Sequence, residues 1–161
     1  MDRGEPRSRP ERAERAARAE WARPGSIALT FLGGALGVGA REALTAALPT
    51  EDPIPLAILV ANLLGAFLLG VLLEALARRT GSRAARARLF LGTGLLGGFT
   101  TYSALALGVT QLVAEGRPWL ALGYGGGTVL VGAVATWAGI VVGAAIRGQD
   151  RGAAHPGESH A

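Results

Sequence analysis

Four long apolar runs divide this 161-residue chain, and each is long enough to cross a bilayer. They cover residues 26–48, 54–76, 89–114 and 118–146, while most charged residues lie in the segments between and around them. The helices of a soluble protein would carry a polar face at helical spacing, which none of these runs does. The pattern predicts an all-α membrane protein with four transmembrane helices, a polar segment at 1–25 and another at 147–161.

The third run is predicted to break at mid-membrane. Gly97 and Gly98 come shortly before Thr-Thr-Tyr-Ser at 100–103. Glycine is a poor helix former, and hydroxyl side chains compete for backbone hydrogen bonds. A broken helix is tolerated in a bilayer only where protein or a water-filled cavity shelters its backbone. The break therefore indicates an ion or solute site rather than a passive anchor.

Polar side chains in the other runs each have two open interpretations. Arg41 either faces protein or extends to the membrane interface. Asn62 either hydrogen-bonds another helix or offers its amide to an anion. Tyr124, Thr128 and Gly132 follow one another at four-residue spacing and so share a helical face. The hydroxyls of that face either line a pore or bond to their own i−4 carbonyls.

Glycines recur at short intervals in the first run, at Gly33, Gly34, Gly37 and Gly39. Small residues at three- and four-residue spacing let helices approach closely in lipid. This spacing favours a close contact between the first span and another helix.

The arginines predict one orientation in the membrane. All 16 basic residues are Arg, and the net charge is +4. Seven lie in the N-terminal segment, five follow the second run and two follow the fourth, against Arg117 alone in the connections on the other side. This asymmetry fits the positive-inside rule better than nucleic-acid binding, so no nucleic-acid partner is expected. The sequence predicts a multi-pass protein of the cell membrane with both termini cytoplasmic.

Catalytic chemistry has little support in the sequence. There is no cysteine, and His155 and His160 both lie in the C-terminal segment, so no His or thiolate cluster can form within the apolar runs. The acids beside the runs, Glu42, Glu74 and Glu115, lie near their ends. An enzyme is therefore not expected.

Three motifs occur in order along the first three runs: Gly33-Gly34-x-x-Gly37-x-x-x-Arg41, Asn62-x-x-Gly65-x-Phe67-x-x-Gly70 and Gly94-x-x-Gly97-Gly98-x-Thr100-Thr101-Tyr102-Ser103. Over residues 26–146 the chain resembles the small fluoride channels of the Fluc family, also called CrcB. The resemblance implies an antiparallel dimer that passes fluoride passively out of the cytoplasm.

The resemblance also implies roles for individual residues. A structural sodium ion would lie at the dimer centre on the backbone carbonyls of Gly97 and Thr100, since carbonyl oxygens can replace the hydration shell of a cation. The fluoride path would include five polar residues: Asn62, Tyr102, Ser103, Tyr124 and Thr128. Three further motif residues would be structural: Arg41, Gly98 and Thr101.

The chain also departs from the family pattern. Tyr102 and Leu105 replace two phenylalanines, whose electropositive ring edges would face fluoride. Gly132 replaces a hydroxylic residue, and Ala57-Ile58 replaces Gly-Thr.

The one-sided arginines disfavour an antiparallel homodimer, because each chain would then have to insert both ways. We therefore predict a heterodimer with an inverted paralogue, with pairing to itself as the other possibility. The alternatives are a non-conducting partner subunit and a small multidrug-type exporter. A proton-coupled exporter would need a carboxylate near the middle of a span, which argues against it.

Overall fold

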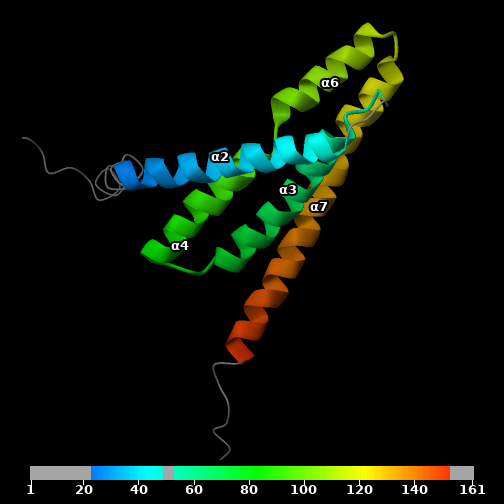
Figure 1. The fold of residues 1–161 in the computed structure, drawn as a ribbon. Helices are drawn as coiled ribbons and strands as arrows, with labels where there is room; N and C mark the ends of the chain where they lie inside the picture. Colours follow the sequence, from blue (N-terminus) through cyan, green and yellow to red (C-terminus); the bar gives the residue numbers. More distant parts are fainter. Residues whose placement is uncertain (1–22, 49–52, 153–161) are drawn as a thin grey trace, which may run out of the picture.

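The computed structural model describes residues 23–48 and 53–152, and every regular element in these ranges is a helix. The first span is α2 (Pro24–Ala47), the second is α3 (Leu56–Leu76) and the fourth is α7 (Pro118–Gly152) (Figure 1). The third span, Ser82–Ala114, is built from four consecutive helical pieces. Four helical segments are long and apolar enough to cross a membrane, so the predicted four-span architecture is confirmed.

The ends of the spans differ from the sequence-based bounds in informative ways. The sequence-based bounds leave residues 77–88 as a connection between two runs, but Ser82–Ala87 forms the short helix α4, because alanine and arginine are good helix formers. α7 continues through Gly152, beyond the predicted end at 146. Residues 1–22 and 153–161, which make up most of the two predicted polar segments, lie outside the described residues.

The third span changes helix type before it breaks. After α4 it continues as the π-helix η1 (Arg88–Leu96) and the short helix α5 (Gly97–Phe99). Thr100 (φ −82°, ψ 155°) and Thr101 (φ −152°, ψ 120°) are extended, and α6 (Tyr102–Ala114) begins after them. The predicted break is therefore present, with helix on both sides of it.

The first half of the third span packs on α2 through glycines. Gly33 lies against the backbone of Phe90, and a Cβ on Gly94 would stand only 2.8 Å from the carbonyl oxygen of Thr30. Gly37 likewise lies against the backbone of Leu95. Because each of these glycines brings two backbones together, the predicted close contact of the first span is confirmed.

The second span and the second half of the third span both pack on α7. α3 runs beside α7, with Gly139 against the backbone of Phe67 and Gly143 close to that of Val71. α6 contacts α7 through a buried cluster of side chains: Leu105, Leu112, Ala121 and Tyr124. In Figure 1, α6 extends away from α2 and turns back into α7 at the end of the molecule opposite α4.

Candidate functional site

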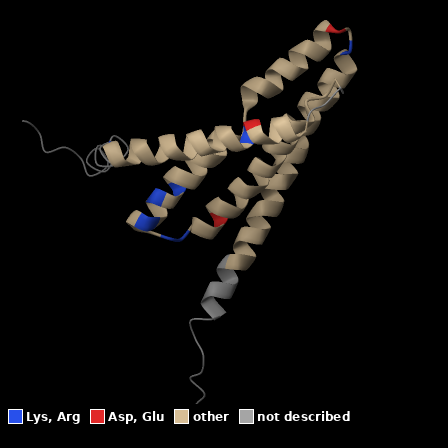
Figure 2. Cartoon of the chain, viewed as in Figure 1, with Lys and Arg blue, Asp and Glu red and all other residues tan. Residues whose placement is uncertain are grey.

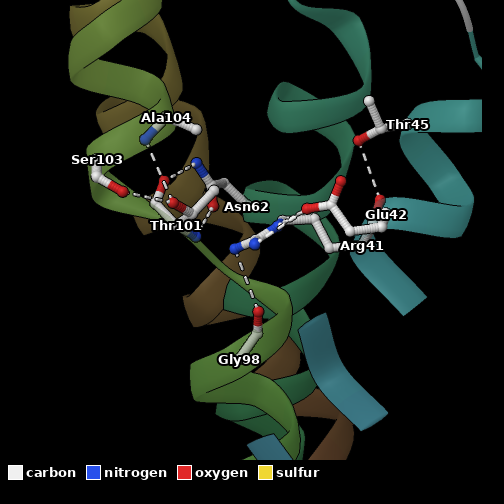
Figure 3. Close-up of polar contacts among 8 residues, drawn as sticks. All are labelled: Arg41, Glu42, Thr45, Asn62, Gly98, Thr101, Ser103 and Ala104. Atoms are coloured by element: carbon white, nitrogen blue, oxygen red, sulfur yellow. Dashed lines mark hydrogen bonds and ion pairs between the residues drawn. The ribbon is translucent and has the colours of Figure 1, made fainter. Parts of the chain in front are cut away.

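Asn62 holds the extended backbone of the break. Its Nδ2 donates to the carbonyl oxygen of Thr101 at 3.0 Å, and its Oδ1 accepts from the Thr101 N–H at 2.8 Å. Figure 3 shows the Asn62 side chain reaching across to the break from the neighbouring helix. Of the two interpretations of Asn62, a hydrogen bond between helices is therefore observed. Oδ1 of Asn62 thus takes the place of the Gly97 carbonyl, which would accept from the Thr101 N–H in an unbroken helix.

Arg41 approaches the break from α2, on the other side (Figure 3). Its Nη1 lies 3.4 Å from the carbonyl oxygen of Gly98, and its Nη2 lies 3.2 Å from Oε1 of Glu42. The Arg41 side chain is 20% exposed, whereas that of Glu42 is 63% exposed. Arg41 thus faces protein, and its positive charge lies beside the end of α5.

The two threonines of the break use their hydroxyls differently. Thr101 is the N-cap of α6, because its Oγ1 accepts from the Ala104 N–H at 3.3 Å and lies 3.1 Å from Oγ of Ser103. The Thr100 hydroxyl donates back to the carbonyl of Leu96 at 2.9 Å. Thr101 therefore starts the second half of the span, and Thr100 ends the first half.

The break leaves the backbone carbonyls of Gly97 and Thr100 without their usual hydrogen-bond donors. In an unbroken α-helix, each carbonyl accepts from the N–H four residues ahead. The N–H of Thr101 instead donates to Asn62, and the N–H of Ala104 donates to the Thr101 hydroxyl. The Gly97 and Thr100 carbonyls thus lose their α-helical donors, so these oxygens suit a cation.

Gly65 was not among the predicted site residues, yet it lets the second span reach the break. A Cβ on Gly65 would collide with Cγ2 of Thr100. Gly65 lies three residues after Asn62, so both face the same side of α3. That spacing was the signal in the sequence that could have identified it.

The predicted face of α7 points into the protein. Tyr124 and Thr128 are each 5% exposed, and a Cβ on Gly108 of α6 would lie 3.1 Å from Cε1 of Tyr124. The Thr128 hydroxyl donates to the Tyr124 carbonyl four residues back, which is the second interpretation considered for this face. The Tyr124 hydroxyl is buried and has no hydrogen-bond partner among the residues that the structure describes.

The two remaining predicted site residues, Tyr102 and Ser103, are exposed. The Tyr102 side chain is 82% exposed, and Ser103 follows it at the start of α6. The structure therefore gathers Asn62, Thr101 and Ser103 at the break, whereas Tyr124 and Thr128 lie between α6 and α7. Within residues 23–48 and 53–152, no group of three or more His, Cys, Asp or Glu is placed to hold a metal ion.

Comparison with known proteins places the chain in a family. Residues 28–140 match the family described as "CrcB-like protein, Camphor Resistance (CrcB)". A protein named fluoride-specific ion channel FluC 2 from Leifsonia xyli subsp. xyli is 48% identical over 75% of this chain and 85% of its own length. Fluoride-specific ion channel FluC 1 from Cutibacterium acnes is 44% identical over 78% of this chain and 87% of its own length.

A third relative has a somewhat lower identity. Fluoride-specific ion channel FluC from Deinococcus radiodurans is 40% identical over 70% of this chain and 90% of its own length. The matched residues include all three motifs and the helix break, which lies within the third motif. The chain therefore belongs to the CrcB-like family.

Proposed function

We propose that this chain is a subunit of a fluoride channel that lets fluoride leave the cytoplasm passively and so lowers its toxicity. The observation that carries the proposal is the helix break whose backbone is held by Asn62, in a chain 48% identical to a protein named as a fluoride-specific ion channel. A break held by hydrogen bonds to protein keeps polar backbone at membrane depth without unfolding the span.

Polar groups beside the break support a path for an anion. The Asn62 amide has two N–H groups, and one donates to Thr101, which leaves the other for a ligand. The Tyr124 hydroxyl, buried without a described partner, is a donor of the same kind. We assign Tyr102, Ser103 and Thr128 to the same path. The Arg41 guanidinium also lies beside this region, with the Glu42 carboxylate offsetting part of its charge.

The carbonyls of Gly97 and Thr100 would hold a sodium ion, which would bind the two subunits to each other. The support is that the α-helical donors of both carbonyls are engaged elsewhere. A bound sodium ion supplies positive charge, and this chain contributes neutral backbone oxygens to it.

We propose an antiparallel dimer in which the partner is an inverted paralogue. The exposed Tyr102 and the apolar face of α7 offer surface for a second subunit. Two relatives carry the numbers 2 and 1 in their names, as expected where one organism has two such chains. The arginine asymmetry supports cytoplasmic termini for this chain. A reporter fused to the C-terminus that became active only outside the cell would contradict this orientation.

Fluoride efflux from liposomes tests the proposal. The full chain is reconstituted alone and then with its candidate paralogue, and external fluoride is recorded with a fluoride electrode. We expect efflux only when both chains are present. Efflux from this chain alone would contradict the obligate heterodimer but keep the channel. No efflux from either preparation would contradict the channel function.

A second candidate function is a partner subunit that does not itself conduct. The observation in its favour is Leu105, which is 8% exposed and packs into the α6–α7 cluster in place of an aromatic ring. Substitutions in the two chains of an active heterodimer distinguish the candidates. If Asn62→Ala in this chain leaves efflux unchanged while the matching change in the partner abolishes it, this chain does not form the conducting path.

A further inference from the structure

The turn between α3 and α4 concentrates positive charge at one end of the spans. Arg78 and Arg79 follow α3, and Arg83, Arg86 and Arg88 follow within ten residues. The sequence has no acidic residue between Glu74 and Glu115. Figure 2 shows blue basic residues on the turn before α4, on α4 and at the start of η1. The positive charge is therefore concentrated in this short segment.

Hydrogen bonds within the turn hold its shape. Nη2 of Arg88 donates to the carbonyl of Leu76, at the end of α3, and to that of Arg79 at 3.1 Å. Gly81, with φ +94°, turns the chain into α4 through a conformation that other residues rarely adopt. The guanidinium of Arg88 thus acts as a C-terminal cap of α3 and ties the two spans together. A turn fixed in this way presents its exposed arginines in one arrangement.

Four arginines of this turn are exposed, and three of them are Arg78, Arg83 and Arg86. Ala84, which lies between Arg83 and Arg86 in the chain, is 6% exposed and packs inward. Nε of Arg86 donates to the Ser82 carbonyl at 3.3 Å, which orients that side chain along α4. Arg83 and Arg86 are three residues apart and therefore lie on one face of the short helix.

The neighbouring acid is directed elsewhere. A Cβ on Gly143 of α7 would stand 2.9 Å from Cβ of Glu74, so Glu74 lies on the face of α3 that packs against α7. α4 itself, which carries Arg83 and Arg86, contains no acidic residue.

An apolar surface continues directly from the arginines. Leu73 of α3 is 51% exposed and Leu91 of η1 is 38% exposed. Leu73 is three residues before Leu76, and Leu91 is three residues after Arg88. Each leucine is therefore about one helical turn farther into the membrane spans than the hydrogen bond from Arg88 to Leu76. The positive charge at the end of the spans matches an anionic lipid headgroup, and the exposed leucines next to it match the acyl chains of the same lipid.

We propose that Arg78, Arg83 and Arg86 bind the phosphate headgroup of an anionic phospholipid whose acyl chains lie against Leu73 and Leu91. This inference does not depend on fluoride conduction. Arginine guanidinium groups bind phosphate oxygens through paired N–H donors. The surface therefore favours a headgroup with a net negative charge over a zwitterionic one, which carries a cation of its own beside the phosphate. The lipid would hold the α3–α4 turn at the membrane surface.

Thermal unfolding of the full chain in detergent tests the proposal. Removing arginines could invert the orientation of the chain across a membrane, whereas purified protein in detergent micelles has no such orientation. The chain is titrated with dioleoyl phosphatidylglycerol, with dioleoyl phosphatidylcholine and with inorganic phosphate. We expect the unfolding midpoint to rise with phosphatidylglycerol alone. Stabilisation by phosphatidylcholine to the same extent, or by inorganic phosphate at the same concentration, would contradict an anionic lipid site.

Substitutions locate the effect. An arginine near an anionic lipid surface contributes about fivefold to affinity, so R78Q/R83Q/R86Q is expected to shift the phosphatidylglycerol titration by roughly 100-fold. R117Q, which changes the arginine at the opposite end of the spans, is the matched control and should titrate as the unchanged chain. If the triple variant is not recovered folded, R83Q and R86Q are titrated singly, and each should shift the curve by about fivefold. Unchanged titrations in the variants would overturn the proposal.

Discussion

The two halves of the third span are held to the rest of the protein in opposite ways. Before the break, η1 and α5 lie on α2 with backbone against backbone, through Gly33, Gly37 and Gly94. After the break, α6 lies on α7 through large side chains, among them Leu105 and Leu112. The first contact depends on glycines, whose lack of a side chain lets the backbones meet. The second contact depends on large side chains that fill the space between the helices. The same span should therefore be damaged by added atoms in one half and by removed atoms in the other.

The break lets one span serve both contacts. An unbroken helix would continue α5 in a straight line and would carry α6 along its direction. The extended Thr100 and Thr101 instead let α6 leave α2 and reach α7, as Figure 1 shows. Asn62 of α3 bonds to Thr101 at the joint and so couples the two halves. Four substitutions, taken from the largest expected effect to the smallest, test this contrast.

Adding one methyl group to the first half should have the largest effect. In Gly37→Ala the new Cβ collides with the carbonyl of Leu95, and backbone cannot rotate away as a side chain can. We expect a loss of about 3 kcal/mol of stability from this overpacking. Unfolding in detergent, followed by tryptophan fluorescence, measures it.

Gly39→Ala is the matched control, because a Cβ at Gly39 meets nothing within 4 Å in the described chain. Alanine is the better helix former by about 1 kcal/mol, so this variant should be as stable as the unchanged chain or slightly more stable. Equal effects at the two positions would show that α2 and η1 are not in close contact.

Removing atoms from the second half should have the next largest effect. Leu112 is 1% exposed in the α6–α7 cluster, so Leu112→Ala leaves a cavity. We expect a loss of about 2.5 kcal/mol, toward the lower end of the range for buried leucines. Leu107→Ala on the same helix is the control, because Leu107 is 59% exposed and its truncation leaves no cavity. Similar midpoints for the two variants in the same unfolding assay would contradict the side-chain contact.

Removing the hydrogen bonds between Asn62 and Thr101 should destabilise both halves of the third span. Asn62→Ala removes two hydrogen bonds and leaves the N–H and carbonyl of Thr101 without that partner. The expected loss is about 2 kcal/mol, together with faster hydrogen exchange of the Thr101 amide. Leu64→Ala, at a position 45% exposed on the same helix, should leave that exchange rate unchanged. A Thr101 amide that stays equally protected in Asn62→Ala would mean that another group holds the break.

Removing the cap of α6 should have the smallest effect and act on the second half alone. Thr101→Val keeps the shape of the side chain but loses the oxygen that accepts from the Ala104 N–H. We expect a cost of about 1 kcal/mol, typical of a lost N-cap. Thr100→Val is the control, because its hydroxyl bonds only back to Leu96 in the described contacts, and it should change stability by less than about 0.5 kcal/mol. A larger effect at Thr100 than at Thr101 would reverse the roles of the two threonines.

Much of the fold was predictable because the relevant signals are local. The four apolar runs became the four spans, and Gly97, Gly98 and the adjoining threonines marked the break. The π-helix η1 was not predicted, since no periodic feature of its sequence distinguishes it from an α-helix. The helix α4 was not predicted either, because its arginines place it in the polar connection between two apolar runs.

The candidate site was predictable in its residues but less so in its contacts. Asn62 and Arg41 stood out as polar groups in apolar spans, and each had two open interpretations. The structure directs Asn62 to Thr101 and Arg41 to Gly98, both beside the break. These partners lie 39 and 57 residues away in the chain, so no local pattern could identify them.

The sequence alone determined the number of spans, the position of the break and the asymmetry of the arginines. These depend on the length of apolar runs relative to the bilayer and on the helix preferences of single residues. The tertiary structure decided which faces meet, for example that Gly37 lies in a contact and Gly39 does not. Spans that are apolar all round carry no polar face to mark the buried side, so only the neighbouring helices choose it.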